Sequence, residues 1–241
     1  MYNDSKKEKM ELFYSELVRV NEFINLTSIT NREEVEVKHF RDSLSAVEFI
    51  KKIAENSWNC KDNEPLRLRH KSNWSPLVAD IGTGAGFPSI PLAIMLPDVS
   101  FTLIETVGKK VNFLLDIKDK LELRNVEVIK SRVEELPKEK MYDICVTRAV
   151  ASMPTLLEYS LPFVKLNGHL IMYKGSNYIE ELNISKNALT ELGGKVETIE
   201  KYNLEFNGEI LERALLVVKK IAETPSKYPR DKNKPRLKPL L

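Results

Sequence analysis

Apolar side chains recur every three or four positions through the first fifty residues. That period is typical of amphipathic helices, and it predicts one helix over residues 6–23 and a second helical stretch over residues 35–50. Asn31 precedes the second stretch and is followed by two glutamates, which favours Asn31 as an N-cap. We therefore expect an N-terminal helical region, residues 1–54, made of two or three short helices.

The helical period is lost over residues 55–76, where Asn, Lys, Arg, Pro and two Trp gather. This composition predicts a basic linker or loop. The cluster formed by Arg67, Arg69, His70 and Lys71 either contacts RNA or is a solvated surface, and we favour the solvated surface.

Short apolar runs alternate with helical patterns from Leu77 onward. The runs LVADIG, FTLIE, VEVIKS, YDICVTR and HLIMYKG are interpreted as strands separated by helices, which predicts a mostly parallel sheet with crossover helices. Two last runs, KVETIEKY and RALLVVKK, are joined by the short FNGEI connection and predict an antiparallel hairpin. The expected fold class is α/β, doubly wound and Rossmann-like, with this domain over residues 77–220.

The composition is typical of a globular protein with one large domain. Of the 241 residues, 42% are hydrophobic and 30% are charged, and there is no apolar run of membrane-spanning length and no apolar signal-peptide core. We therefore expect a cytoplasmic location. Cys60, Cys145 and the three scattered histidines lack the spacing of a disulfide framework or a metal site, so we predict no bound metal.

Positive charge is concentrated near the C-terminal end of the chain. Between Lys219 and Leu241 there are eight basic and two acidic residues, a net charge of +6 that leaves −4 for the rest. A basic tail, residues 221–241, indicates either an anionic partner such as nucleic acid or a solvated end, and composition leaves both open. The residues assigned to RNA binding are Lys174 and six tail residues: Lys227, Arg230, Lys232, Lys234, Arg236 and Lys238.

A glycine-rich segment, DIGTGAGFP, connects the first predicted strand to the next helix. Gly82, Gly84 and Gly86 stand at alternate positions, so main-chain N–H groups can approach a ligand closely. Ligands of open α/β sheets bind at this edge of the sheet, and the alternative is a tight turn that serves only packing. The spacing D-x-G-x-G-x-G differs from the dinucleotide motif G-x-G-x-x-G. Asp80 would repel a pyrophosphate but can pair with a cationic group, which favours S-adenosylmethionine as the ligand.

Three further polar residues follow neighbouring strands. Glu105 ends FTLIE and is predicted to accept hydrogen bonds from ribose hydroxyls, the alternative being a plain surface charge. Glu134 follows VEVIKS, where an adenine edge would be read. Arg148 ends YDICVTR and is expected to face the same crevice.

Several segments together resemble one known family. From about Asn25 to Leu240 the chain is similar to the bacterial small-subunit ribosomal RNA guanine-N7 methyltransferases of the RsmG type, also called glucose-inhibited division protein B. The segments that carry the resemblance are NLTSIT, KHFRDSL, DIGTGAGFPSIPLAI, GKKVNFL, RVEE, VTRAVA, LIMYKG, YPRDKNKP and KPLL. One departure is Asn233, which stands where the family tends to have glycine.

The resemblance implies a cofactor and a substrate. The cofactor is S-adenosylmethionine, contacted by Gly82, Phe87, Val133, Glu134 and Arg148, and the substrate is a guanine in the decoding-region hairpin of 16S ribosomal RNA. Together with our own assignments, the predicted cofactor site contains Asp80, Gly82, Gly84, Gly86, Phe87, Glu105, Val133, Glu134 and Arg148.

The expected chemistry is methyl transfer by in-line displacement. Guanine N7 carries a free lone pair at neutral pH, so no general base is needed and no catalytic residue is assigned. We expect the fork of Arg148 to position the cofactor carboxylate or the guanine. N7 lies on the major-groove edge, which is inaccessible in paired A-form RNA, so the target should be unpaired or flipped out.

Three other functions remain open at this stage. They are a nucleotide-dependent oxidoreductase, a non-catalytic RNA-binding module that holds S-adenosylmethionine, and a small-molecule methyltransferase. We expect the protein to be a monomer.

Overall fold

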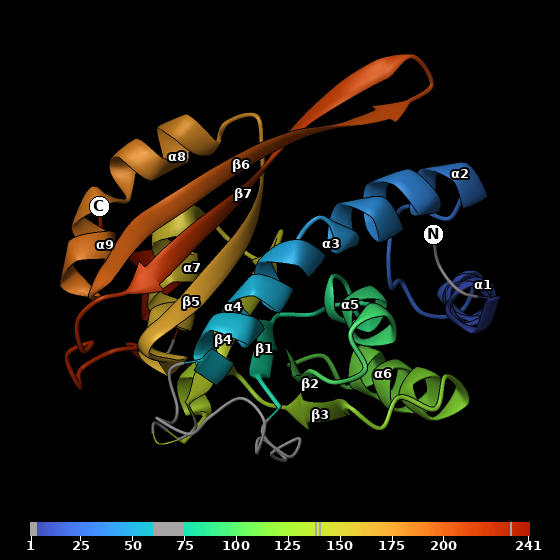
Figure 1. The fold of residues 1–241 in the computed structure, drawn as a ribbon, viewed down its shortest axis with the longest axis horizontal. Coiled ribbons are helices and arrows are strands. Elements are labelled where there is room, and N and C mark those ends of the chain that lie inside the picture. Colours follow the sequence, from blue (N-terminus) through green and yellow to red (C-terminus); the bar gives the residue numbers. More distant parts are fainter. Residues whose placement is uncertain (1–3, 60–74, 138, 140, 232) are drawn as a thin grey trace.

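The computed structural model describes residues 4–59, 75–137, 139, 141–231 and 233–241. Within these ranges seven strands form one sheet in the order β3-β2-β1-β4-β5-β7-β6 (Figure 1). The first five in that order are parallel, and β7 is antiparallel to both of its neighbours. The predicted α/β fold and C-terminal hairpin are confirmed. The strands are β1 (Leu77–Ile81), β2 (Ser100–Glu105), β3 (Val126–Lys130), β4 (Tyr142–Arg148), β5 (Val164–Gly175), β6 (Gly194–Phe206) and β7 (Glu209–Lys220).

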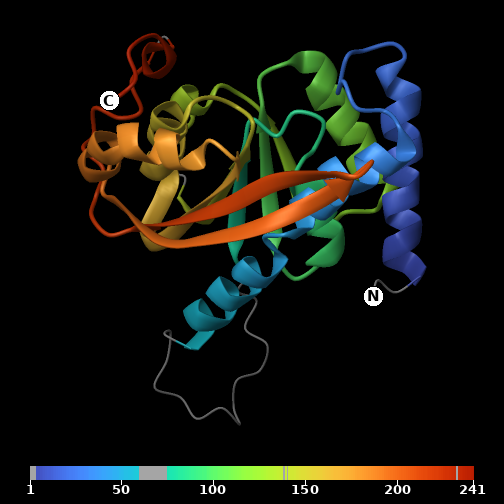
Figure 2. The same ribbon diagram turned by 90° about the horizontal axis from the view of Figure 1, so that it is seen from above.

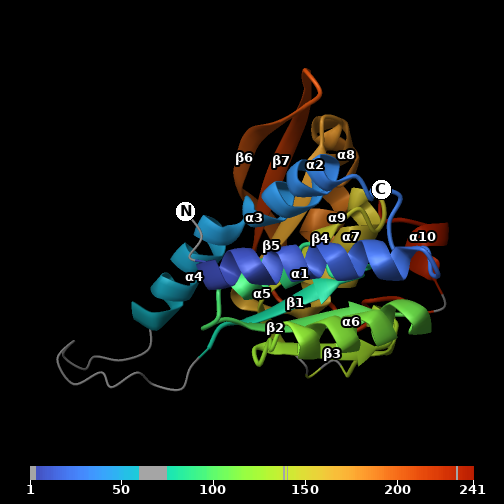
Figure 3. The same cartoon turned by 90° about the vertical axis from the view of Figure 1, so that its right-hand side faces the viewer.

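Helices cover both faces of the sheet (Figure 3). The N-terminal helices, α5 and α6 pack on one face, and α7, α8 and α9 pack on the other. Consecutive residues of β1 pack into opposite cores. Val78 lies in the core beneath the N-terminal helices, α5 and α6, and Ala79 lies in the core beneath α7, α8 and α9, as expected for a strand buried on both faces. The helices are α1 (Asp4–Asn21), α2 (Arg32–Val35), α3 (Asp42–Leu44), α4 (Val47–Asn59), α5 (Ser89–Met95), α6 (Gly108–Lys120), α7 (Met153–Ser160), α8 (Tyr178–Ile184), α9 (Lys186–Glu191) and α10 (Lys234–Leu237).

Strand β1 lies at the topological switch point of the sheet. Its neighbours are β2 on one side and β4 on the other, so the loops that follow these strands meet at one edge. Glu105 and Arg148 are the last residues of β2 and β4. The topology therefore brings the predicted site residues to the same edge.

The N-terminal region is helical as predicted, with two differences. Asn31 caps α2 by accepting a hydrogen bond from the N–H of Glu34 (3.1 Å). After α2 the helix changes to π-helical geometry in the segment η1 (Glu36–Arg41), which the apolar period does not indicate. Helix α4 also continues to Asn59, past the predicted boundary at residue 54. The predicted basic cluster at residues 67–71 lies outside the described residues.

The β6–β7 hairpin extends far beyond the parallel part of the sheet, toward the N-terminal region (Figure 2). Its tip meets η1, where the Lys38 ammonium lies 4.7 Å from the centre of the Phe206 ring. The hairpin thereby brings Tyr202 of β6 and Arg213 of β7 beside the start of α3.

The described residues of the C-terminal tail pack against α7 and α9. The anchor is a bidentate ion pair between Arg230 and Glu158, with Nη2–Oε2 at 2.6 Å and Nε–Oε1 at 2.8 Å. The Glu158 side chain is 0% exposed. Tyr228 is also buried, and its hydroxyl donates to Glu191 at 3.1 Å. Tyr228 and Arg230 are therefore packed on the body of the protein, whereas Lys227, Lys234 and Lys238 are exposed, so the tail is solvated only in part.

None of the helices within the described ranges is long and apolar enough to cross a membrane.

Candidate functional site

The glycine loop after β1 adopts a backbone that glycine favours. Gly82, Gly84 and Gly86 have φ angles of +73°, +63° and +95°. A β-carbon at Gly82 would lie 2.8 Å from Val150, and one at Gly86 would lie 2.5 Å from an Ile90 carbon. At Gly84 it would meet no described atom within 4 Å. Gly82 and Gly86 thus allow close packing, whereas Gly84 faces open space where a ligand can reach the backbone.

Asp80 is fully buried beneath the glycine loop. Its Oδ2 accepts a hydrogen bond from the main-chain N–H of Ser89, at the start of α5 (3.3 Å). Burial raises the pKa of Asp80 to about 7, against the opposing effect of the hydrogen bond from the Ser89 main chain. A cation bound nearby would favour the ionised carboxylate.

Glu105 is held in place by four hydrogen bonds. Its Oε1 accepts from the N–H groups of Thr106 (2.8 Å) and Val107 (2.9 Å) and from the Thr106 hydroxyl (3.3 Å). Its Oε2 accepts from the N–H of Gly84 at 3.0 Å. With 6% exposure, Glu105 is not a surface charge, so that alternative is wrong. The carboxylate connects β2 to the glycine loop, and Oε2 retains capacity for a further donor.

A cavity of about 290 Å³ opens beside the glycine loop, and we call it the β2–β3 cavity. It contains the predicted residues Val133 and Glu134. The Glu134 side chain is 5% exposed, and no described group hydrogen-bonds its Oε1, although the Arg132 guanidinium is 3.7 Å away. A buried acceptor without a donor suits a ligand amino group. The cavity is lined by Ile81, Gly82, Ile104, Thr106, Ser131, Arg132, Val133, Glu134, Val150, Tyr159, Asn233 and Arg236.

A second cavity of about 580 Å³ lies at the ends of β4 and β5, and we call it the β4–β5 cavity. Val150 lines both cavities, so they meet at this residue. The charged residues of the β4–β5 cavity include more cations than anions, which favours an anionic ligand. They are Lys38, Arg148, Lys174 and Arg213 against Asp42 and Glu181.

A third cavity of about 630 Å³ lies between α1, η1 and the tip of the β6–β7 hairpin. It borders neither the glycine loop nor the ends of the parallel strands. Its lining carries both signs of charge, and we assign no chemistry to it.

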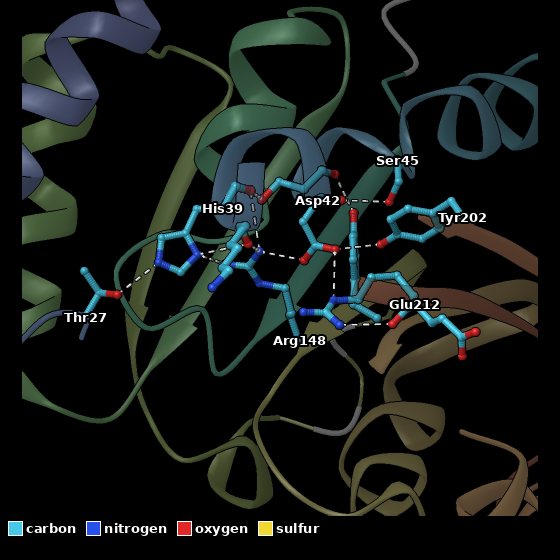
Figure 4. Close-up of polar contacts among 11 residues, drawn as sticks. Thr27, His39, Asp42, Ser45, Arg148, Tyr202 and Glu212 are labelled. Atoms are coloured by element: carbon cyan, nitrogen blue, oxygen red, sulfur yellow. Dashed lines mark hydrogen bonds and ion pairs between the residues drawn. The ribbon is translucent and has the colours of Figure 1, made fainter. Parts of the chain in front are cut away.

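Arg148 joins the end of β4 to the N-terminal region (Figure 4). Its Nη1 donates to Asp42 Oδ2 at 2.9 Å and to the Lys38 carbonyl oxygen at 3.3 Å. The guanidinium also lies 5.2 Å from the centre of the Phe87 ring. These contacts, together with those to the His39 carbonyl oxygen and ring, fix Arg148 between the glycine loop and the β4–β5 cavity. Its side chain is 12% exposed.

Asp42 is a functional candidate that the sequence did not reveal. Besides Arg148, it receives a hydrogen bond from the Tyr202 hydroxyl at 2.7 Å, and the Arg213 Nε lies 3.9 Å away. One buried carboxylate therefore connects α3, β4, β6 and β7 (Figure 4). The only sequence signal was its place in the segment KHFRDSL, because its partners lie more than a hundred positions away.

His39 is poorly suited to act as a general base. Its Nε2 lies 3.0 Å from the Thr27 hydroxyl, and its Nδ1 lies 3.2 Å from both Arg148 Nη2 and the Lys38 carbonyl oxygen. Burial and the Arg148 charge lower the pKa of His39 to about 4. The ring stacks on Phe87 with centroids 4.4 Å apart. His39 is thus a neutral, fully engaged packing residue.

Phe87 and Lys174, both predicted site residues, are largely buried. The Phe87 side chain is 5% exposed between His39 and Phe13, so it secures the N-terminal helices to the glycine loop. Lys174 lines the β4–β5 cavity, and its ammonium pairs with Glu181 at 2.7 Å.

The predicted RNA-binding residues of the tail fall into two groups. Arg230 is committed to Glu158, and Arg236 Nη2 donates to the Val150 carbonyl oxygen at 3.0 Å. The other group consists of three exposed lysines, Lys227, Lys234 and Lys238. Lys227 pairs with Glu191, and Lys234 pairs with Asp231. Lys232 lies outside the described residues.

No group of three or more His, Cys, Asp or Glu residues in the described part of the chain could hold a metal ion.

Comparison with known families gives a match over most of the chain. Residues 6–62 and 65–216 match the family described as rRNA small subunit methyltransferase G. Curated proteins named ribosomal RNA small subunit methyltransferase G are similar over nearly the full length. One from Clostridium perfringens is 41% identical over 99% of this chain and 92% of its own. Another, from Caldanaerobacter subterraneus, is 44% identical over 97% of this chain and 90% of its own.

Solved structures support the fold alone. The YcgJ protein from Bacillus subtilis superimposes with a TM-score of 0.52 at 14% identity, over 74% of this chain and 99% of its own. A Bacillus halodurans protein with a provisional assignment as a methyltransferase has a TM-score of 0.50 at 13% identity, over 74% of this chain and 100% of its own. The solved structures thus agree with the Rossmann-like α/β fold seen in the sheet order.

Proposed function

Because the chain belongs to the rRNA small subunit methyltransferase G family, we propose that it transfers a methyl group from S-adenosylmethionine to N7 of a guanine in 16S ribosomal RNA. The target lies in the decoding-region hairpin. The observation that carries the proposal is the pair of cavities that meet at Val150. One is suited to a nucleoside, the other to an anionic substrate, and they adjoin at the edge of the sheet where the glycine loop opens.

The β2–β3 cavity and the glycine loop fit S-adenosylmethionine. The open space at Gly84 admits a ligand to the backbone. Glu134 Oε1 accepts no hydrogen bond from a described residue, so it can accept one from the adenine amino group. We assign Glu105 Oε2, which accepts one hydrogen bond from the N–H of Gly84, as the acceptor for a ribose hydroxyl. When bound, the cofactor supplies a methyl group activated by its sulfonium. We assign Asp80, Gly82, Gly84, Gly86, Glu105, Val133 and Glu134 to its site, with Phe87 and Arg148 bordering it.

The β4–β5 cavity is proposed to receive the RNA nucleotide. Lys38, Lys174 and Arg213 attract the phosphate backbone. Since N7 carries its own lone pair, the residues of this cavity need only orient the guanine and exclude water. The neutral, engaged state of His39 agrees with a mechanism without a general base. The substrate guanine must be unpaired to present N7.

The exposed tail lysines are proposed as additional phosphate contacts. Lys227, Lys232, Lys234 and Lys238 belong to this group, and Lys174 acts within the cavity. We further propose that the protein works in the cytoplasm as a monomer, with the domain boundaries predicted from the sequence except that the N-terminal helical region continues to the end of α4 at Asn59.

The test is to map N7-methylguanine in 16S ribosomal RNA from cells with and without the gene. Methylation at one decoding-region guanine should be lost without the gene and restored by purified protein with S-adenosylmethionine. Unchanged methylation would refute the assigned reaction. Tight binding of cofactor and RNA without methyl transfer would indicate a binding module, and a dinucleotide retained through purification would indicate an oxidoreductase.

Replacing Glu105 with alanine should weaken cofactor binding by about 1–3 kcal/mol, the scale for hydrogen bonds to a charged group. The substitution removes the ribose acceptor and also releases Gly84, Thr106 and Val107. Glu105→Gln keeps an acceptor toward Thr106 and Val107, so its loss should be smaller. Calorimetric titration with S-adenosylmethionine gives both values. If neither variant differs from the wild type, the ribose assignment is wrong.

Binding of S-adenosylmethionine should tighten as the pH rises through about 7. The pKa of Asp80 is about 7 in the free protein, and a cationic ligand prefers the ionised carboxylate. Affinity is therefore lower below this pKa and higher above it, by up to about tenfold between pH 6 and pH 8. Asp80→Asn should abolish the pH dependence. Equal wild-type affinity at the two pH values would show that Asp80 does not pair with the cofactor.

A further inference from the structure

Two residues of the C-terminal tail line the β2–β3 cavity. Asn233 and Arg236 belong to its wall, together with Tyr159 of α7. The remaining wall comes from the loops after β1, β2, β3 and β4. A segment that follows the last strand of the sheet therefore completes the cavity that we assign to the cofactor.

Arg236 holds the residue at which the two cavities meet. Its Nη2 donates to the main-chain oxygen of Val150 at 3.0 Å. The preceding residue, Ala149, has a φ of +55°, a conformation that an L-residue with a side chain rarely adopts. The same Val150 side chain occupies the space where a β-carbon at Gly82 would lie. A shift of Val150 would therefore change the shape of both cavities and loosen the glycine loop.

The tail itself is fixed on α7 by several independent contacts. The Thr155 hydroxyl donates to the Pro235 carbonyl oxygen at 2.9 Å, and the Tyr159 hydroxyl lies 3.5 Å from Asn233 Oδ1. The bidentate pair between Arg230 and Glu158 anchors the chain just before this turn. Arg236 is thus presented to Val150 by a rigid support and not by a free tail.

We infer that Arg236 is a positioning residue for the cofactor. It closes one wall of the β2–β3 cavity and, through Val150, sets the border between the cofactor and RNA cavities. This inference rests on the proposed function. It assigns to cofactor binding a residue whose charge alone suggested a contact with RNA phosphate.

The test compares Arg236→Met with Lys234→Met. Both residues are exposed and both changes remove one positive charge from α10, but Lys234 pairs only with Asp231 among the contacts of the described residues and does not line the cavity. Calorimetry with S-adenosylhomocysteine, the demethylated cofactor, should show binding about tenfold weaker for Arg236→Met, the effect of losing a hydrogen bond from a charged group. Lys234→Met should bind like the wild type.

Steady-state kinetics separate positioning from RNA contact. For Arg236→Met the KM for S-adenosylmethionine should rise while the KM for RNA and its salt dependence stay unchanged, and Arg236→Lys should recover part of the loss. Unchanged cofactor affinity in the folded variant would overturn the inference. So would a rise in the RNA KM alone with a weaker salt dependence, since that is the signature of a phosphate contact.

Two further measurements cover the cases in which Arg236→Met does not fold or the wild type does not bind the cofactor. If Arg236→Met does not fold, Arg236→Gln should weaken S-adenosylhomocysteine binding, because the shorter, uncharged side chain cannot reach the Val150 carbonyl oxygen as Arg236 does. Wild-type affinity in that variant would refute the inference. If the wild type itself fails to bind S-adenosylhomocysteine, the proposed cofactor is wrong, which is a different failure.

Discussion

Arg148→Met is expected to abolish methyl transfer and to lower the free energy of unfolding by about 3–5 kcal/mol, the scale for removing one partner of a buried ion pair. Asp42, with its side chain 7% exposed, would lose its closest cation. The N-terminal region would also lose the hydrogen bond that Arg148 gives to the Lys38 carbonyl oxygen. Denaturant unfolding and a methyl-transfer assay on ribosomal RNA measure the two effects.

Two further variants separate stability from positioning. Arg148→Lys keeps the charge but cannot reach Asp42 and the η1 carbonyls together, so it should fold better than Arg148→Met and still lose most activity. The double variant Arg148→Met with Asp42→Asn removes both charges and should recover part of the stability without activity. Normal activity in Arg148→Lys would show that the fork of Arg148 has no role in orienting either ligand.

Gly84→Val is expected to abolish binding of S-adenosylmethionine in a protein that still folds. A β-carbon at Gly84 would meet no described atom within 4 Å, so no internal clash opposes folding. The side chain would instead fill the space through which the cofactor approaches the glycine loop. The cost to folding is the strain of a β-branched residue at a φ of +63°, about 1–3 kcal/mol.

Gly208 provides a matched control for that strain. It has a φ of +79° in the turn of the β6–β7 hairpin, and a β-carbon there would also meet no described atom within 4 Å. Gly208→Val should therefore show a similar loss of stability with wild-type cofactor affinity. Calorimetry measures the cofactor affinity of the two variants, and thermal unfolding measures their stability. Retained affinity in folded Gly84→Val would remove the glycine loop from the site.

The sequence predicts the sheet and the glycine turn after β1 well because both depend on local patterns. Each strand is an apolar run between helical stretches, and DIGTGAGFP is a contiguous signal for the turn after β1. The position of Glu105 at the end of β2 is likewise visible in the apolar run FTLIE. These features need only residues that are close together in the chain.

The features that sequence reasoning missed depend on distant residues. The partners of Asp42 come from β4, β6 and β7, and no periodicity reports such convergence. The tail was judged by its charge, but Arg230 is neutralised by Glu158, 72 positions earlier. The substitution of glycine by Asn233 in the tail has a local explanation. Asn233 adopts a left-handed backbone (φ +59°), and asparagine is among the non-glycine residues that tolerate it best.

The opposite pKa shifts of Asp80 and His39 mean that folding in effect transfers a proton from an imidazole to a carboxyl group. In the unfolded chain, between about pH 4 and 6.5, His39 carries the proton and Asp80 does not. In the folded protein burial reverses this, because the pKa of Asp80 is about 7 and that of His39 about 4. The raised pKa of Asp80 makes the free energy of unfolding fall as the pH rises through this interval. The lowered pKa of His39 makes the free energy of unfolding increase over the same interval. Since each state binds one proton in total, the two dependences cancel, and this pair of buried groups adds almost no net pH dependence to the stability of the ligand-free protein in this interval.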